Sequence, residues 1–374
     1  MSELRFLNLF NFFCVSPTYL ERDGETNYYV CRLRHACSNA LVLVLIFLIY
    51  SVATIWKTLQ DYYFMGETVM GLATVILYTS RILVMGPLIA WTIVNKQSLL
   101  DLFNRVLLME KAIQQLRRDG SSTLDLGGLR SLRLEVALIV ALLGLTWSVD
   151  FYLAWTFGSL LEIVLHIVSF GFPFLEFISS LHRAYTEILV VFISGQLEAL
   201  HQCIVNEENL NTIRKAMELL NELEQCKLRI ASTMGLPHVF YLLDVLVKCS
   251  VRAYLIFYLI DLGSDDLTIP ITVAMLALNG SSFYLYTYRY NMVQDKEAEL
   301  KNALKTMQYS NIEHQSIDQK DFYDLINLKL MMESPKITAC GLFEINLEVF
   351  YNVFAAIITY IVILFQFRSF ETSP

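Results

Sequence analysis

Long apolar runs alternate with polar segments along the chain. A helix needs about 20 apolar residues to cross roughly 30 Å of bilayer hydrocarbon. Seven runs approach or exceed this length, and each predicts a membrane-spanning helix. They cover residues 38–56, 68–94, 134–157, 160–200, 236–262, 268–290 and 340–367. The fourth run is too long for one crossing, so its inner part, from about His182, is expected to continue as helix beyond the membrane.

Three segments outside these runs carry apolar residues at helical spacing with charges between them. They are 99–116, 209–230 and 296–307. This spacing is typical of amphipathic helices. We interpret the segments as helices that continue the spans and pack together below the membrane. The alternative is that they lie separately on the bilayer surface, but the recurrence of an apolar face in all three favours packing.

The positions of Lys and Arg predict the orientation in the membrane. Alternate connecting segments, with the last of them counted from Arg289, hold 22 of these residues, against 2 in the remaining ones. Because cytoplasmic loops carry the excess of positive charge, the N-terminal segment 1–37 is predicted to lie inside. Seven spans then place the C-terminus outside. The predicted fold class is an all-α membrane protein with seven transmembrane helices, whose helices extend into a cytoplasmic anchor bundle.

Composition agrees with a membrane protein. Of 374 residues, 55% are hydrophobic and 17% are charged, whereas soluble domains are about 25% charged. The net charge of −8 offers no basic surface for nucleic acid. No cleavable signal peptide is visible, so the run 38–56 is expected to act as an anchor. None of the seven Cys falls in a predicted outer segment, so no disulfide is expected. The Cys and His residues form no cluster at zinc spacing, and no metal or cofactor is predicted.

Polar residues inside the spans are the candidates for function, because charges there are costly and face protein or water. Asp244 and Lys248 are four residues apart and predict a local ion pair. Aromatic side chains with a few polar groups in the outer halves of the spans predict a ligand pocket open to the outside. Its candidate residues are Tyr78, Trp147, Asp150, Phe151, Trp155, His166, Arg252 and Tyr254. The alternative is an interfacial aromatic belt with a buried salt bridge, for example between Asp150 and Arg252.

The seventh run carries a polar stripe. Asn352, Thr359 and Gln366 are spaced seven residues apart, which returns each to within about 20° of the last on a helix. Ile363 lies close to the same line. Such a stripe on an apolar helix faces a partner helix or water. If several copies surround an axis, it faces a pore, and these four residues line it. Uncharged side chains replace ion hydration weakly, which permits conduction without tight binding.

The end of the chain resembles a known family. Thr359-Tyr360, five apolar residues and then Gln366-Phe367 resemble the signature of insect gustatory receptors in their last span. The run Thr-Ala-Cys-Gly-Leu-Phe-Glu-Ile-Asn at 338–346 is also similar to the segment that precedes that span in the family. The close resemblance covers about the last 40 residues. Upstream, only the length, the number of spans and the inverted topology agree.

The resemblance implies a tastant-gated cation channel in the plasma membrane of a sensory neuron. Four subunits, identical or mixed with other gustatory receptors, each contribute the last helix to a central pore. Each subunit binds a small-molecule tastant among the outer halves of its second to sixth spans. The pore constriction is expected near Ile363 and Gln366. The implied division is a cytoplasmic segment 1–37, spans with the pocket 38–290, an anchor segment 291–336 and the pore helix with a short tail 337–374.

Other function classes make different predictions. A metabotropic heptahelical receptor predicts the opposite topology. A transporter tends to show internal repeats, and none is detectable in the sequence. A membrane enzyme needs a metal cluster or an acid–base pair at one membrane level. If the chain is a gustatory receptor, its short length and lack of long outer loops weakly favour a receptor for bitter compounds over one for carbon dioxide.

Overall fold

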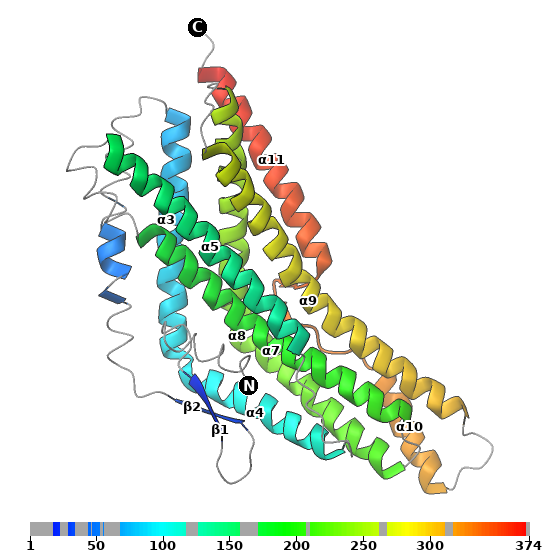
Figure 1. Ribbon diagram of the computed structural model, residues 1–374. Helices are drawn as coiled ribbons and strands as arrows, with labels where there is room; N and C mark the ends of the chain where they lie inside the picture. Colours follow the sequence, from blue (N-terminus) through cyan, green and yellow to red (C-terminus); the bar gives the residue numbers. More distant parts are fainter. Residues whose placement is uncertain are drawn as a thin grey trace.

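Long helices run side by side in this computed structural model (Figure 1). The structure describes residues 18–22, 29–33, 44–45, 47–52, 55, 68–116, 126–157, 171–206, 210–261, 268–310 and 317–371. The helices are α3 (Thr68–Val94), α4 (Lys96–Leu116), α5 (Leu126–Phe157), α7 (Gly171–Asn206), α8 (Leu210–Asp261), α9 (Thr268–Ser310), α10 (Ile317–Met331) and α11 (Leu347–Glu371). Two antiparallel hairpins pair β1 (Thr18–Arg22) with β2 (Tyr29–Leu33), and β3 (Thr338–Ala339) with β4 (Phe343–Glu344).

Two helices are far longer than a membrane is thick. α8 has 52 residues and α9 has 43. At 1.5 Å per residue they measure about 78 Å and about 65 Å, against about 30 Å of hydrocarbon. Both must therefore continue beyond the bilayer. This confirms that 209–230 and 296–307 extend the adjoining spans as helix, from residue 210 in the case of α8.

Five described helices are long and apolar enough to cross a membrane. The candidate spans are Val75–Val94, Gly128–Val149, Leu175–Asn206, Ile269–Thr306 and Leu347–Gln366. The predicted span 236–262 is helical within α8 up to Asp261, but Asp244, Lys248 and Arg252 lower its hydropathy. Of the predicted span 38–56, only residues 44–45, 47–52 and 55 are described, and they are helical. The predicted run 160–170 lies outside the described residues.

α4 packs against one end of the long helices. Its apolar side chains Leu99, Val106 and Ile113 are fully buried, and it contacts both α7 and α8. Gln196 on α7 donates a hydrogen bond of 2.8 Å to the Val106 carbonyl. A buried ion pair between Lys227 and Glu297 joins α8 to α9 in the same region. The amphipathic segments therefore pack together, as predicted, rather than separately exposing their apolar faces.

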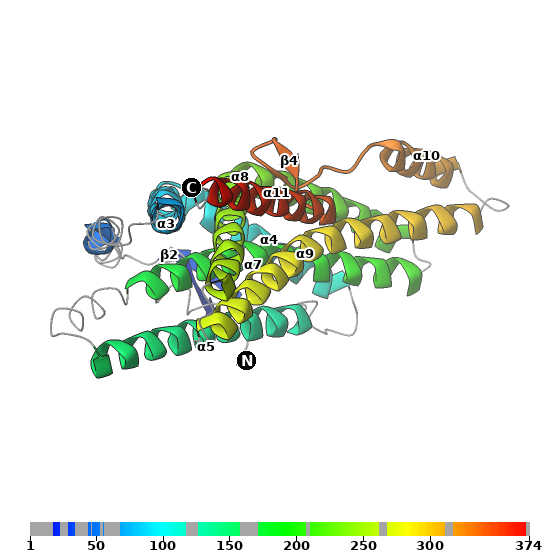
Figure 2. The same cartoon turned by 90° about the horizontal axis from the view of Figure 1, so that it is seen from above.

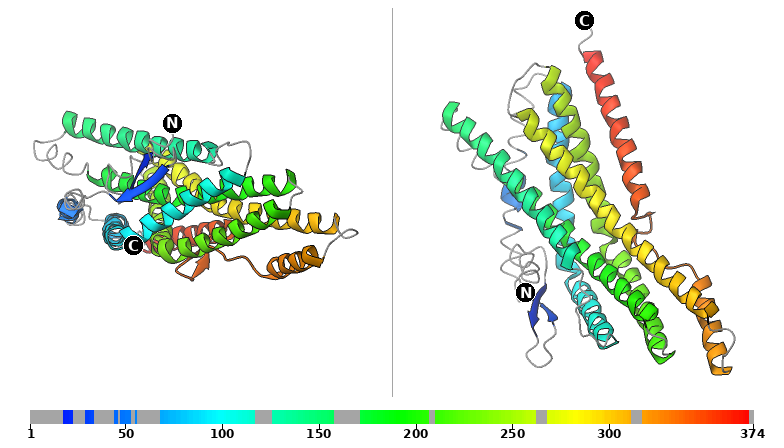
Figure 3. Two further views of the ribbon diagram at one scale, coloured as in Figure 1. Left: turned by 90° about the horizontal axis from the view of Figure 1, so that it is seen from below. Right: turned by 45° about the vertical axis from the view of Figure 1, so that its right-hand side comes forward.

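α11 lies at one side of the bundle. It contacts α8, α9 and α3, and the view from above places it on the side opposite α5 (Figure 2). A further view shows α11 running alongside the C-terminal part of α8 and the N-terminal part of α9, away from α10 (Figure 3). Among the described residues, the last helix therefore has neighbours from its own chain on one face only.

Candidate functional site

The polar stripe of α11 points away from the described part of the bundle. Val353 and Ile357 are each 5% exposed and form the face packed against the bundle. Asn352, Thr359, Ile363 and Gln366 are all exposed. At about 100° per residue, the stripe is centred about 130° around the helix from the buried face. Thr359 Oγ1 donates to the Ala355 carbonyl at 2.9 Å, so this hydroxyl bonds to its own helix.

The aromatic residue next to the stripe has a different environment. The Phe365 ring centroid lies 5.2 Å from that of Phe257 and 6.1 Å from that of Tyr254, both on α8. Phe365 therefore attaches the C-terminal part of α11 to α8. Tyr360 is 51% exposed, and the Phe367 side chain lies outside the described residues.

The β3–β4 hairpin connects α10 to α11 and is seated on α8. Cys340 and Gly341 turn the chain with positive φ angles of 53° and 72°. A Cβ atom added to Gly235 of α8 would lie 2.6 Å from the Cys340 nitrogen, so only glycine permits this approach. Gln294 of α9 donates to Glu344 at 2.7 Å. The hairpin thus fixes the start of the pore-helix candidate against two other helices.

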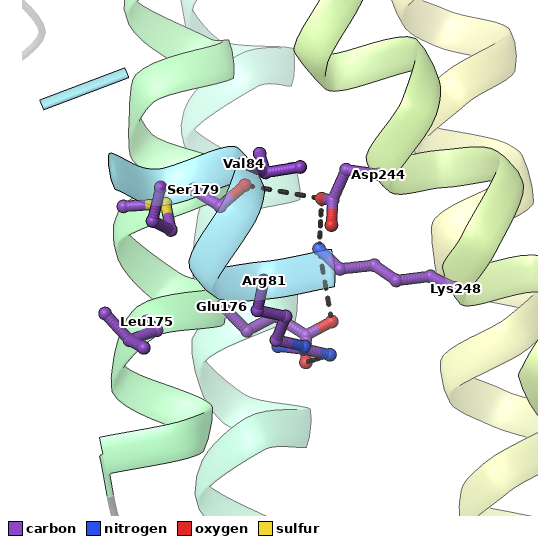
Figure 4. Close-up of a pocket in the computed structure, with 8 residues that line it drawn as sticks. Arg81, Val84, Leu175, Glu176, Ser179, Asp244 and Lys248 are labelled. Atoms are coloured by element: carbon purple, nitrogen blue, oxygen red, sulfur yellow. Dashed lines mark hydrogen bonds and ion pairs between the residues drawn. The ribbon is translucent and has the colours of Figure 1, made fainter. Parts of the chain in front are cut away.

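Five charged side chains meet inside the bundle between α3, α7 and α8. Figure 4 shows Arg81, Glu176, Asp244 and Lys248, and the fifth is Arg252. Glu176 Oε2 lies 2.8 Å from Arg81 Nη2, and Glu176 Oε1 lies 2.9 Å from Arg252 Nη2 and 3.8 Å from Lys248 Nζ. Lys248 also pairs with Asp244, which confirms the ion pair predicted from their spacing. We call these five residues the Glu176 cluster.

A small pocket lies beside the Glu176 cluster. Its empty space of about 160 Å³ lies between α3, α7 and α8 and includes open solvent, and none of it is wide enough to admit a water molecule. Its lining is Arg81, Val84, Met85, Leu175, Glu176, Ser179, Asp244 and Lys248. The pocket is therefore lined by charged side chains and by three apolar ones, Val84, Met85 and Leu175 (Figure 4).

A second charged group, the Glu135 network, joins four helices. Arg183 of α7 pairs with Glu135 of α5 and, at 3.3 Å, with Glu187. Arg289 of α9 pairs with the same two carboxylates. Arg183 also donates to the Tyr241 hydroxyl of α8 at 3.2 Å. The charges balance as two arginines against two glutamates, which is the arrangement that buried ions require.

The predicted ligand residues do not form one group in the described part of the chain. Trp147 and Phe151 stack on α5 at 5.4 Å between ring centroids, and Phe151 lies 6.1 Å from Trp155. Arg252 and Tyr254 lie on α8, which is not among the neighbours that α5 packs against most extensively. The side chains of Tyr78 and Asp150, and all of His166, lie outside the described residues.

Sequence reasoning missed the partners of Arg252 and Arg183. The salt bridge considered for Arg252 was with Asp150, but the described partner is Glu176. Glu135 and Arg289 were not singled out, because they fall at the ends of predicted spans. The sequence does indicate that such partners exist, because each buried charge requires a partner of opposite sign. Within the described residues, no group of three or more His, Cys, Asp or Glu side chains could hold a metal ion.

A family model and two solved structures match this chain. A family model described as 7tm chemosensory receptor matches residues 4–371. The structure of the insect olfactory receptor OR5 from Machilis hrabei is similar, with a TM-score of 0.64 and 13% identity over 98% of this chain and 97% of that one. Its complex with eugenol gives a TM-score of 0.68 and 14% identity over 98% of both chains. A search of curated proteins finds no match.

At such identities, the likeness to OR5 shows the fold. The family match covers almost the whole chain, well beyond the short motifs of the last span. It also excludes an enzyme, and it agrees with the apolar helices described above. The chain therefore belongs to the family of 7tm chemosensory receptors, a membrane-protein family, as its resemblance to insect chemoreceptors implied.

Proposed function

We propose that the chain is a subunit of a gustatory receptor that works as a ligand-gated cation channel. Four subunits surround a central pore lined by α11, and a small-molecule tastant bound within each subunit opens it. The observation that carries this proposal is the exposed stripe of Asn352, Thr359, Ile363 and Gln366 on the face of α11 turned away from its own chain. A polar stripe facing lipid would be unfavourable, whereas around an axis it would face water and ions.

The gate is assigned to Ile363 and Gln366. A ring of Ile363 side chains closes a pore by excluding water, because ions do not cross a dry constriction easily. The Gln366 amides offer oxygens to ions when the helices separate. The gustatory assignment, rather than an olfactory one, rests on the motif Thr359-Tyr360 to Gln366-Phe367. The fold similarity to an olfactory receptor does not distinguish the two.

Two substitutions test the pore. Gln366→Glu places carboxylates around the axis, so we expect a higher permeability of divalent relative to monovalent cations in whole-cell recordings. Ile363→Ser wets the closed constriction and is expected to give current without ligand. Phe365→Ser is the control, because this ring packs on Phe257 within the subunit; it should alter surface expression rather than ion preference. Gln366→Glu channels that conduct with unchanged ion preference would contradict the assignment.

The metabotropic alternative is tested by topology. The channel proposal places the C-terminus outside, so a tag after Pro374 should be stained on unpermeabilised cells and a tag before Met1 should not. The reverse pattern would support a receptor with the opposite orientation.

A further inference from the structure

The linker between α10 and β3 leads directly to the hairpin that fixes the start of α11. It covers residues 332–337, and Figure 2 shows it as coil between α10 and β4. The backbone groups from Glu333 to Lys336 form no backbone–backbone hydrogen bond with the described residues. Glu333 and Lys336 are exposed, and Ser334 and Pro335 are half-buried. Such a segment opens locally at little cost in free energy, because few contacts must break.

Ser334 and Pro335 form a Ser-Pro pair within this linker. Proline holds its own φ near −65° and biases the residue before it towards an extended conformation. A serine in extended chain, followed directly by proline, is the feature that proline-directed Ser/Thr protein kinases recognise. The chain has two more such pairs, at residues 16–17 and 373–374, and Ser334 is the one whose surroundings the structure describes.

Lys301 of α9 lies against the Ser334 hydroxyl. Its ammonium group donates a hydrogen bond to Ser334 Oγ, and its side chain is only 13% exposed. Lys301 Nζ also lies 3.9 Å from a carboxylate oxygen of Glu224 and 3.9 Å from one of Glu297. Both distances exceed the reach of a hydrogen bond. The serine hydroxyl is therefore closer to this ammonium group than either carboxylate is.

Other lysines hold the two carboxylates more closely. Glu297 pairs with Lys227 of α8, and Glu224 pairs with Lys329 of α10. Both contacts are shorter than those to Lys301. A phosphate group carries a charge of about −1.5 to −2 at pH 7 and three strong acceptor oxygens. Placed on the serine hydroxyl, it would stand beside the Lys301 ammonium and give it the close anion that the two carboxylates do not provide.

We propose that Ser334 is a phosphorylation site for a proline-directed Ser/Thr protein kinase, and that Lys301 binds the phosphate. The kinase transfers the γ-phosphoryl group of ATP: phosphorus bonds to Ser334 Oγ, its bond to the β-phosphate oxygen breaks, ADP leaves, and the hydroxyl proton passes to a base of the kinase. The phosphate then ties the linker to α9 and restrains the connection between α10 and α11. The inference rests on the proposed function, because the channel topology places 291–336 in the cytoplasm, where ATP and protein kinases are present.

Phosphorylation of the purified full chain in detergent tests the site independently of topology and current. All proteins carry Ser16→Ala and Ser373→Ala, so that Ser334 is the remaining serine before a proline. The probe is a cyclin-dependent kinase with Mg-ATP, and mass spectrometry of the peptide containing Ser334 gives the phosphorylated fraction. We expect phosphorylation that Ser334→Ala abolishes and that Pro335→Ala slows at least about tenfold. No phosphate at Ser334, or equal rates with and without Pro335, would overturn the inference.

The melting temperature of the same protein tests the role of Lys301. A phosphate bound by Lys301 stabilises the folded state, so we expect phosphorylation to raise the melting temperature by about 2 °C or more. Lys301→Gln should lose this rise, and Lys301→Arg should keep it. Lys305→Gln, at an exposed position one turn further along α9, is the matched control and should show the parental rise. An equal rise in Lys301→Gln, or no rise in the parent, would overturn the inference.

Intact and permeabilised cells separate this inference from the proposed function. The kinase and radiolabelled ATP, added to the medium, should label Ser334 only after permeabilisation. Labelling of Ser334 on intact cells would place the linker outside, and it would overturn the inference together with the channel topology. Protein that shows the expected labelling and the expected rise in melting temperature, but no ligand-evoked current, would support the inference and contradict the channel proposal alone.

Discussion

Single buried charges hold the helices together through long-range pairs. Arg289 of α9 lies 3.1 Å from Glu135 and also pairs with Glu187, which is fully buried. Arg289→Met leaves two carboxylates sharing Arg183. Breaking such a buried pair typically lowers the free energy of unfolding by about 3–5 kcal/mol. We expect a loss of that order in thermal unfolding of the purified protein.

A matched lysine supplies the control for Arg289→Met. Lys296 Nζ lies 3.7 Å from Glu198, and these side chains are 20% and 42% exposed. Exposed pairs contribute about 1 kcal/mol or less, so Lys296→Met should leave the melting temperature nearly unchanged. If the two variants unfolded at the same temperature, the Glu135 network would contribute no more than a surface pair.

Trp147 is the residue that best tests the predicted ligand pocket. It is partly buried and stacks on Phe151. Trp147 is not a member of the Glu176 cluster, so its substitution leaves those ion pairs unchanged. Trp147→Ala is expected to raise the ligand concentration needed for half-maximal current without changing ion selectivity. Tyr152→Ala, at a position 65% exposed on the same helix, should respond like the parent. A parental dose response from Trp147→Ala at normal surface levels would place the ligand elsewhere.

At the scale of elements, the contact between α8 and the β3–β4 hairpin controls where α11 begins. Gly235→Ala would put a methyl group 2.6 Å from the Cys340 backbone nitrogen, so the hairpin must move. Inserting a methyl group into a packed site costs about 1–3 kcal/mol. We expect Gly235→Ala to lower the melting temperature and to reduce ligand-evoked current per receptor at the surface.

Gly144 of α5 is the control for Gly235. An added Cβ there meets nothing within 4 Å, and Ala is favoured over Gly in a helix by about 0.5–1 kcal/mol. Gly144→Ala should therefore keep or raise the melting temperature. A Gly235→Ala protein as stable and as active as Gly144→Ala would show that the hairpin does not need this close contact.

The helices could be predicted because their signals are local. Apolar runs and helical spacing identified α3, most of α11 and the amphipathic segments, since each signal is contained within about 20 residues. The predicted span 340–367 began too early, because residues 340–346 belong to the β3–β4 hairpin and its flank, and α11 begins at Leu347. The amphipathic part of α8 and the predicted span 236–262 form one continuous helix that includes Pro237. That continuity was expected from the amphipathic pattern at 209–230, although a proline within a helix removes one backbone hydrogen bond.

The pairing of residues far apart in the chain could not be predicted. The partner of Arg252 is Glu176, 76 residues away, and Gly235 meets Cys340 across more than a hundred residues. Neither contact has a periodic signal, because each depends on how whole helices are placed. The Asp244–Lys248 pair was predictable for the opposite reason, since the i, i+4 spacing itself brings the two side chains together.

At the scale of the whole molecule, α11 has a large apolar and polar surface that the described residues of its own chain do not cover. Tyr351 is 64% exposed, Ile358 59% and Val362 49%, in addition to the polar stripe. In a membrane, lipid or other subunits cover such a surface. The proposed tetramer assigns the stripe to the axis and the flanking apolar side chains to neighbouring subunits or lipid.

Cysteine cross-linking distinguishes the tetramer from a lone subunit in lipid. Copies of Ile363→Cys meet near the axis, so mild oxidation in membranes should join pairs of chains, seen as a band at twice the 43.1 kDa chain mass on a non-reducing gel. Phe365→Cys is the matched control, because Phe365 packs on Phe257 of its own subunit and its substitute should cross-link weakly. The unmodified chain gives the background from the exposed Cys340. Equal cross-linking of Ile363→Cys and Phe365→Cys would mean that the stripe does not face an axis, and the pore would have to be sought on another helix.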